Sequence, residues 1–376
     1  MARRITLVIH SLHGGGAERI AVAMANHWSA VGHQVTLITL DKPDNDIYKV
    51  SGQVNRIGLD LMHDSPNAIY ALYSNIRRLT ALRRSIRNSH PDVVVSLVVH
   101  TNILTLLACR GLGLDVVVCE HTDPRHQDIG RLWSRLRRIA YPRCRALTVL
   151  TNGVVDFART LVGTKPIYVL PNPVLVETVQ APQRSGDGNR YVVAMGRLAW
   201  AKGFERLIEA FSTIASKNEN WRLKILGEGP DREMLERRIK ELNLLDQVEL
   251  TGWIADPYDE LRNSDLCVMS SRFEGFPMVL LEAMACRLPV VSFDCESGPA
   301  EIIRDGIDGI LVPANDIEKL ATAMDRLMSD DELREQLASR APEVSRRFSK
   351  EIFFRRWEAI LNSASQEEFA KLGSSG

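Results

Sequence analysis

The sequence predicts an α/β protein built from two open, parallel β-sheets, each covered by helices on both faces. Short runs that are apolar on both faces alternate with segments of helical period along nearly the whole chain, which is the pattern of a parallel sheet buried between helices. This pattern stops once, around residues 176–189, in a stretch of proline, glycine and polar residues. It then starts again. We therefore expect two sheet domains joined by a linker.

Length and charge agree with two domains. The chain has 376 residues, of which 45% are hydrophobic and 25% charged, so it is globular and long enough for two cores. Its net charge is zero, but the halves differ. Residues 1–190 hold 23 Lys and Arg against 14 Asp and Glu, a net +9, and the remainder holds 24 against 33, a net −9. The basic N-terminal half predicts an anionic partner on that side.

In the N-terminal half the first element is a strand, "RITLVIH" (4–10), followed by a glycine loop, "SLHGGG" (11–16), and a helix through Ala30. Four further strands are expected at "VTLITL" (35–40), "DVVVSLV" (92–98), "DVVVCE" (115–120) and "ALTVL" (146–150).

The C-terminal half repeats the arrangement, with helices from about Gly203 and Pro230. Strands are expected at "YVVAMG" (191–196), "RLKILG" (222–227), "QVEL" (247–250), "DLCVM" (265–269), "PVVSF" (289–293) and "GILV" (309–312). The last stretch, "SKEIFFRRWEAIL" (349–361), is an amphipathic helix that must cover an apolar surface. Open α/β sheets bind ligands at the carboxyl ends of their strands, so two facing sheets predict a site in the cleft between them.

Cysteine usage and hydropathy predict the cellular setting. The six cysteines contain no CxxC pair and most lie in apolar segments, and the N-terminus does not resemble a signal peptide, so a reduced cytoplasmic location is expected. No apolar run approaches the roughly 20 residues that span a bilayer. Any membrane contact is therefore expected to be peripheral.

Two glutamates eight positions apart, Glu274 and Glu282, are the first candidate site residues. A helix is expected to start at Phe276–Pro277, where its free N–H groups would suit a diphosphate. Glu282 would then lie two turns into the helix, roughly 10 Å along its axis, and could accept both hydrogens of a ribose diol. Glu274 would face a sugar. A structurally paired core glutamate is the alternative explanation for Glu282.

Two cations form the second candidate element. Arg197 and Lys202 follow a strand and precede a helix in "MGRLAWAKGFERLIEAF". Two positive charges at such a junction suit a doubly charged phosphate group without a metal ion. The alternative is that both are solvated surface charges.

Together these motifs resemble glycosyltransferase family 4, retaining enzymes of the GT-B fold. The resemblance rests on the paired glutamates, "GRLAWAKG", "LGEGP" (226–230), "PNPV" (171–174), "GPAEIIRDGIDGILVPAND" and the glycine loop "SLHGGGAER", and it covers nearly the whole chain. Within the family, the chain resembles bacterial enzymes that extend polyprenyl-diphosphate-linked or surface glycans.

The resemblance implies a role for each motif residue. Arg197 and Lys202 would hold the donor diphosphate and stabilise the leaving nucleotide, Glu282 would hold the ribose, and Glu274 would contact hydroxyls of the transferred sugar. The residues that would surround the donor from the second glutamate motif are Gly275, Phe276, Pro277 and Met278. Gly15 and Gly16 would let the N-terminal loop approach the phosphate and the acceptor.

His121, in "CEHTD", matches a family histidine that lies near the donor sugar, so the catalytic residues implied are His121, Arg197, Lys202 and Glu274. An ordinary loop histidine is the alternative for His121. "HGGG" is neither a GxGxxG loop nor part of a GxSxG hydrolase site. "DND" (44–46) mimics a metal-binding DxD motif but is interpreted as turn chemistry. No metal and no cofactor are expected, because the nucleotide-sugar is a substrate.

Two basic helical stretches predict a peripheral membrane surface or a lipid-diphosphate site, although a solvated helix face would show the same pattern. The first places Arg77, Arg78, Arg83, Arg84 and Arg87 among Ile76, Leu79, Leu82 and Ile86. The second places Arg131, Arg135, Arg137, Arg138, Arg143 and Arg145 among Leu132, Trp133, Leu136 and Tyr141. Nucleic acid is not expected, because no aromatic stacking platform accompanies the charge.

The domains expected are an acceptor-binding domain (1–178), a nucleotide-sugar-binding domain (179–347) and a C-terminal helix with a tail (348–376) that packs back on the first domain. The function implied is retaining transfer from a UDP-hexose or UDP-N-acetylhexosamine to a lipid-linked or surface glycan, at the cytoplasmic face of the membrane. Without an obvious covalent nucleophile, front-face departure and attack is expected. A GT-B epimerase or phosphorylase and a non-catalytic glycan- or lipid-binding scaffold remain alternatives.

Overall fold

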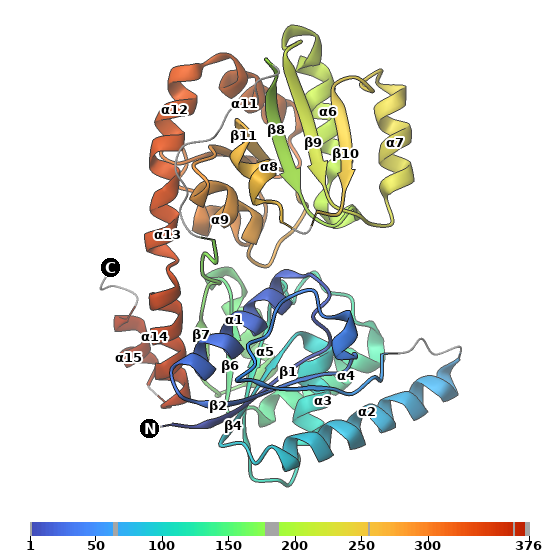
Figure 1. The fold of residues 1–376 in the computed structure, drawn as a ribbon, viewed down its shortest axis with the longest axis vertical. Coiled ribbons are helices and arrows are strands. Elements are labelled where there is room, and N and C mark those ends of the chain that lie inside the picture. Colours follow the sequence, from blue (N-terminus) through green and yellow to red (C-terminus); the bar gives the residue numbers. More distant parts are fainter. Residues whose placement is uncertain (1, 63–66, 177–187, 255, 364, 373–376) are drawn as a thin grey trace. The chain divides into compact units, whose positions relative to one another are not determined.

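The protein divides into two compact units, which Figure 1 shows as a ribbon. The computed structural model describes residues 2–62, 67–176, 188–254, 256–363 and 365–372. The first unit comprises Met1–Pro171 together with Phe354–Ser375, and the second comprises Asn172–Phe353.

The first unit contains a seven-stranded parallel sheet in the order β3-β2-β1-β4-β5-β6-β7. Its strand order reverses between β1 and β4, and such a switch point opens a crevice at the carboxyl ends of the strands. The central strands are apolar on both faces because helices cover both sides. The strands are β1 (Arg4–Ile9), β2 (Gln34–Thr39), β3 (Asn55–Gly58), β4 (Val93–Leu97), β5 (Asp115–Cys119), β6 (Ala146–Val149) and β7 (Ile167–Val169).

Five helices of the N-terminal segment pack on this sheet, and α3 packs against both α2 and α4. They are α1 (Gly16–Ala30), α2 (Ala68–Asn88), α3 (Val99–Ala108), α4 (Gly130–Ala140) and α5 (Val155–Val162), with single turns η1 (Pro43–Asn45), η2 (Tyr141–Arg143) and η3 (Asn152–Val154). The "DND" segment lies at η1, and Asp46 pairs with Arg56 at 2.8 Å. This agrees with its interpretation as turn chemistry.

The second unit contains a six-stranded parallel sheet in the order β10-β9-β8-β11-β12-β13, with the same reversal between β8 and β11. The strands are β8 (Arg190–Met195), β9 (Trp221–Leu226), β10 (Val248–Gly252), β11 (Leu266–Met269), β12 (Val290–Asp294) and β13 (Ile310–Pro313). All six predicted C-terminal strands are therefore present.

The helices of the second unit cover its sheet around a core that includes Phe211, Trp221 and Phe293. They are α6 (Phe204–Ile214), α7 (Arg232–Glu241), α8 (Tyr258–Arg262), α9 (Met278–Ala285), α10 (Pro299–Ile302), α11 (Ile317–Ser329), α12 (Asp331–Arg340) and α13 (Val344–Arg347). Single turns are η4 (Trp200–Lys202), η5 (Ala215–Lys217) and η6 (Ala341–Glu343).

The chain ends with α14 (Lys350–Leu361) and α15 (Gln366–Lys371), and from Phe354 onward it belongs to the first unit. The ring of Trp357 lies edge-on to Trp28 of α1 at 5.5 Å. Arg145 donates a hydrogen bond to the carbonyl of Ile360 at 2.6 Å. The apolar face of the predicted amphipathic helix is thus buried in the first unit.

The prediction of an α/β fold with two parallel sheets is confirmed. Strands β3 and β7 were not predicted. The boundaries between the two units lie after Pro171 and after Phe353, whereas the sequence suggested domain boundaries after residues 178 and 347. Most of the expected linker, residues 177–187, and the end of the tail, 373–376, lie outside the described residues. Among the helices that the structure describes, none combines the length and apolar character needed to span a bilayer.

Candidate active site

In the second unit, Lys202 and Glu274 form an ion pair between two loops. The Lys202 Nζ lies 2.5 Å from the Glu274 Oε1, and the hydroxyl of Ser271 donates to the same oxygen at 2.6 Å. Both charged side chains are largely buried, with 28% and 10% of their surface exposed. The structure therefore brings together a cation and a carboxylate that the sequence places 72 residues apart.

Hydrogen bonds and a close backbone approach hold these two loops together. Gly203 follows Lys202 with a φ of +61°, and a Cβ there would lie 2.4 Å from the carbonyl oxygen of Ser270. The hydroxyl of Ser270 donates to the carbonyl of Lys202 at 3.0 Å, and the N–H of Arg272 donates to that of Ala201 at 2.8 Å. Glycine in "AKG" is thus required by geometry.

The "LGEGP" motif packs against the loop that carries Arg197. A Cβ on Gly227 would lie 2.0 Å from the carbonyl oxygen of Gly196, and one on Gly229 would lie 2.2 Å from that of Leu198. These two glycines therefore let the loop after β9 pack directly against the loop after β8. Arg197 itself is exposed and has no ion-pair partner among the described residues, so its guanidinium can meet an incoming anion.

Helix α9 begins later than the sequence suggested. Its first helical residue is Met278, and Pro277 occupies the N-cap position without a side-chain cap. The N–H groups of its first turn are therefore not capped by a side chain, which suits an anion. Gly275 precedes this turn, whereas Phe276 is 5% exposed and packs its ring on Phe348, so its side chain anchors the loop.

Glu282 is the fifth residue of α9, about 6 Å along the axis from its start, and not two turns in as predicted. It is 1% exposed. Its carboxylate lies near two thiols: burial raises the pKa of Cys267 to about 12, and the charge of Glu282 adds to this rise. Burial likewise raises the pKa of Cys286 to about 11, with Arg262 opposing and Glu282 adding.

In the first unit, His10 and His121 follow the strands β1 and β5, and both interact electrostatically with Glu18. Glu18 of α1 accepts from His10, whose Nε2 lies 3.2 Å from the Glu18 Oε1. Burial lowers the pKa of His121 to about 4, and Glu18 opposes this. Burial raises the pKa of Glu18, but hydrogen bonds from His10 and from its own N–H, with the charges of His10 and His121, lower it overall. We call His10, Glu18 and His121 the His–Glu cluster.

The Glu18 carboxylate occupies the space next to the glycine loop. A Cβ on Gly15 would lie 2.2 Å from the Glu18 Oε2, so Gly15 makes room for the Glu18 carboxylate. Gly16 is the first residue of α1. From the sequence, both glycines were expected to let the loop approach a phosphate and the acceptor. The sequence analysis did not identify Glu18 as the carboxylate that lies at the start of this helix. An acidic residue in the first turn of a helix was the available signal.

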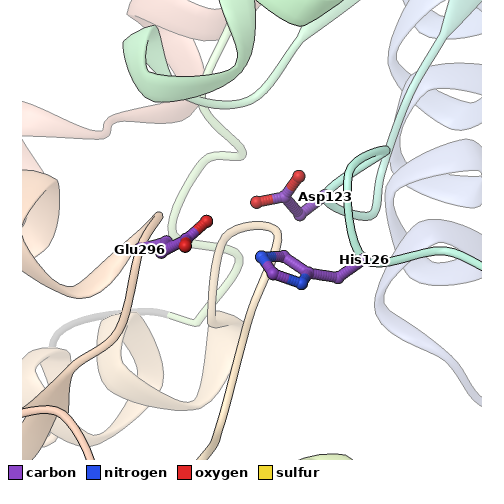
Figure 2. Close-up of side chains that lie close together, drawn as sticks. All are labelled: Asp123, His126 and Glu296. Atoms are coloured by element: carbon purple, nitrogen blue, oxygen red, sulfur yellow. The ribbon is translucent and has the colours of Figure 1, made fainter.

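The loop after β5 carries further polar side chains. Figure 2 shows Asp123 and His126 on this loop, and Glu296 on the loop that follows β12 of the second unit. The side chain of Asp123 is fully buried, and its Oδ2 accepts from the Arg125 Nη2 at 2.6 Å. The loop is therefore held by an internal ion pair.

The basic stretches divide into exposed and internally bonded arginines. Arg78 donates to the carbonyl of Leu61, and Arg83 donates to those of Ala108 and Arg110. The prediction that Arg137 and Tyr141 belong to an exposed basic surface is wrong, because they are 4% and 0% exposed. Among the side chains that the structure describes, the exposed arginines and large apolar residues of the two helices are Tyr70, Tyr73, Ile76, Arg77, Arg84 and Arg87 on α2 and Arg131, Leu132, Arg135, Arg138 and Ile139 on α4.

Two family descriptions match most of the chain. Residues 14–178 match Glycosyltransferase Family 4, and residues 176–344 match Glycosyl transferases group 1. The first match includes Gly15, Gly16 and His121. The second includes Arg197, Lys202 and both glutamates.

Three relatives of this chain are bacterial proteins named for glycan synthesis. The amylovoran biosynthesis glycosyltransferase AmsD of Erwinia amylovora is 26% identical over 96% of this chain and 100% of its own length. An α-1,4-N-acetyl-D-galactosaminyltransferase of Campylobacter jejuni, named for an undecaprenol-diphosphate-linked acceptor, is 27% identical over 95% of this chain and 98% of its own length. An exopolysaccharide phosphotransferase of Streptomyces coelicolor is 32% identical over 74% of this chain, which is 29% of its own length.

The solved structure of HepE from Anabaena in complex with UDP has a TM-score of 0.74 and 18% identity, covering 96% of this chain and all of that one. This likeness shows the fold. With the two family matches and the two parallel sheets, it establishes that the chain belongs to the family 4 glycosyltransferases of the GT-B fold, among relatives that build bacterial glycans.

Proposed function

We propose that this glycosyltransferase moves a hexose or N-acetylhexosamine from a UDP-sugar to a polyprenyl-diphosphate-linked or surface glycan, with retention of configuration. The observation that supports this proposal is the Lys202–Glu274 pair at 2.5 Å, on the same loop as the exposed Arg197, because two cations and a carboxylate suit a donor diphosphate and its sugar. The Campylobacter relative, by its name, uses an undecaprenol-diphosphate-linked acceptor, and HepE binds UDP. Both support the substrate classes proposed.

Charge stabilisation of the leaving group is the central step. As the glycosidic bond breaks, negative charge builds on the β-phosphate, and Arg197 and Lys202 lower the free energy of that state. When the donor binds, Lys202 leaves Glu274 and pairs with the phosphate. The Glu274 oxygens then accept hydrogen bonds from sugar hydroxyls. The uncapped first turn of α9 adds N–H donors to the diphosphate. Two side-chain cations supply this charge, so we propose that turnover needs no metal ion.

Retention then follows from front-face attack. With the leaving diphosphate held by the cations, the acceptor hydroxyl attacks from the face that the diphosphate leaves, and a phosphate oxygen can take its proton. His121, whose pKa of about 4 keeps it neutral at pH 7, can hydrogen-bond a neutral sugar hydroxyl. Glu282 is assigned to the ribose.

Product stereochemistry tests this proposal. The wild-type enzyme is incubated with α-linked UDP-hexoses and UDP-N-acetylhexosamines and a polyprenyl-diphosphate-linked glycan, and the new anomeric proton is examined by NMR. We expect the small coupling constant of an α-linkage. A β-linked product would contradict retention, and transfer only from another nucleotide's sugars would contradict the UDP assignment.

We also propose that the first unit docks on an anionic membrane surface. On α4, the exposed residues Arg131, Leu132, Arg135, Arg138 and Ile139 follow the i, i+1, i+4, i+7, i+8 spacing of one helix face. Leu132 and Ile139 are 68% and 48% exposed. Cations interleaved with exposed aliphatic side chains suit the headgroup region of an anionic bilayer. We call this set the α4 face.

A further inference from the structure

A buried polar network lies at the start of the loop that carries His121. Glu120 directly precedes His121, and its Oε1 accepts from the Arg137 Nη2 of α4 at 2.9 Å. The hydroxyl of Tyr141 donates to the same oxygen. The Asn102 side-chain amide, on α3, donates to the Tyr141 hydroxyl at 3.2 Å and to the carbonyl of Cys119 at 2.9 Å.

All four side chains are removed from solvent. Glu120 and Arg137 are 3% and 4% exposed, and Tyr141 and Asn102 are fully buried. Burial raises the pKa of Glu120, with Arg137 and Tyr141 opposing. The Arg137 Nε is buried and has no hydrogen-bond partner among the described residues. Part of the desolvation cost of the network is therefore not offset by hydrogen bonds, although the Arg137 guanidinium also lies over the Tyr141 ring, 5.1 Å from its centroid.

Stability alone does not account for such a network. Burying two charges costs several kcal/mol per ion, and replacing a buried ion pair with apolar residues of similar volume is often neutral or stabilising. A leucine–methionine contact at these positions would bury as much apolar surface without the desolvation cost. What the charged pair provides is direction, because hydrogen bonds fix the angle between two groups and apolar contacts do not.

The network ties the first residue of one loop to the C-terminal part of the helix that follows that loop. Glu120 is the first residue after β5, and Arg137 lies on α4, which begins where the loop ends at Gly130. The N–H of Glu120 also donates to the carbonyl of Thr148 in β6 at 3.0 Å. The segment between Glu120 and α4 carries His121, which is a member of the His–Glu cluster. A shift of α4 relative to β5 would therefore move His121.

We propose that Glu120, Arg137 and Tyr141 are positioning residues that hold His121 in place for sugar transfer. This inference rests on the proposed function. It predicts that the network can be removed without loss of stability but with loss of turnover, since a displacement of about 1 Å at a reacting group can lower the rate about 100-fold.

The test compares two double variants. Glu120→Met/Arg137→Met removes the buried pair while keeping apolar volume. We expect a melting temperature equal to or above that of the wild type, a kcat for transfer at least about tenfold lower, and a KM for the donor within about twofold of the wild type. The matched control is Arg4→Met/Asp92→Met, which removes an exposed ion pair of 2.8 Å in the same unit. It should leave the melting temperature, the kcat and the KM unchanged. A stable Glu120→Met/Arg137→Met variant with wild-type kcat would overturn the inference.

Tyr141→Phe keeps the ring and removes only the hydroxyl, so it serves if the double variant does not fold. We expect a several-fold lower kcat, and an unchanged kcat would overturn the inference. Arg137→Lys keeps the cation and should retain more activity than Arg137→Met.

Coupling to His121 separates this inference from the proposed function. In a His121→Ala background, Tyr141→Phe should cause little further loss of kcat, because the hydroxyl acts through His121. Losses that multiply would overturn the inference while the wild-type transfer activity still stands. Wild-type transfer by His121→Ala alone would overturn the inference and the role of His121 together. Failure of the wild type to transfer any sugar would instead refute the proposed function.

Discussion

At the scale of single residues, the proposed donor site contains one ion pair. Lys202 and Glu274 neutralise each other at 2.5 Å, while Arg197 remains exposed to solvent. The sequence identified all three, but it assigned the two cations to the donor diphosphate and Glu274 to the sugar. Their contact could not be foreseen, because it depends on Gly203 and Ser270 bringing two distant loops together.

The two glutamates should differ in what they bind. Glu282→Gln should weaken binding of free UDP, because a neutral amide accepts ribose hydroxyls less strongly than a carboxylate. Glu274→Gln should leave UDP affinity unchanged or raised, since it frees Lys202, and should lower transfer. Isothermal titration with UDP measures the first effect and a transfer assay the second. Glu249→Gln, on the exposed side of β10, is the control, and equal weakening of UDP binding by both variants would refute the division of roles.

His121 predicts a pH dependence of stability. Its pKa falls from 6.5 to about 4 on folding, so between these values the unfolded chain binds a proton that the folded chain does not. The free energy of unfolding should therefore decrease as the pH falls from about 6.5 to about 4, by at most about 3 kcal/mol from this group. The lowered pKa of Glu18 acts in the same direction at lower pH.

Urea denaturation at pH 7 and pH 4.5 measures this effect. His121→Gln cannot be protonated and should lose less stability between the two pH values than the wild type. The exposed His90 provides the control His90→Gln, which should behave as the wild type. An identical pH dependence in the wild type and His121→Gln would show that His121 is not held neutral by burial.

At the scale of elements, strand prediction found every strand of the second sheet and the five central strands of the first sheet, but it missed the two edge strands of the first sheet. β3 and β7 have four and three residues and lie at the two edges of the first sheet, so they have only one neighbour and little apolar sequence to mark them. The start of α9 was placed too early because a proline can occupy either the N-cap or the first turn.

The basic stretches show a second limit of the sequence at this scale. Periodicity identifies a helix face that is rich in arginine, but not which arginines the fold uses. Arg78 and Arg83 bond to backbone carbonyls, and Arg137 lies in the buried network. Only the remaining exposed arginines are available to a partner.

The α4 face predicts a salt-dependent affinity for anionic membranes. Each arginine near an anionic surface contributes on the order of 1 kcal/mol, so Arg131→Gln/Arg135→Gln/Arg138→Gln should abolish most recovery with anionic liposomes in flotation. The control Lys217→Gln/Arg237→Gln/Lys240→Gln removes three exposed charges of the second unit and should float as the wild type does. Equal, weak recovery of the wild type with neutral and anionic vesicles would refute membrane docking.

At the scale of the whole molecule, the chain contains two parallel sheets that share the order of their first six strands, the first sheet having β7 in addition. After the second unit, the chain returns to the first unit within α14. The sequence predicted this organisation because hydrophobic patterning is repeated in each half. It could not assign the base, the sugar or the linkage, since those depend on loop shapes. The central proposal for the molecule is that side-chain cations of the second unit stabilise the negative charge of the leaving nucleotide.

Release of UDP from a UDP-sugar in the presence of a polyprenyl-diphosphate-linked acceptor and EDTA tests that claim most directly. We expect acceptor-dependent release by the wild type that EDTA leaves largely intact. Lys202→Ala and Arg197→Ala should each lower it about 100-fold, and Lys217→Ala, which removes an exposed lysine of the same unit, should not. Near-normal release by folded Lys202→Ala, or complete loss in EDTA that Mn²⁺ or Mg²⁺ reverses, would contradict it.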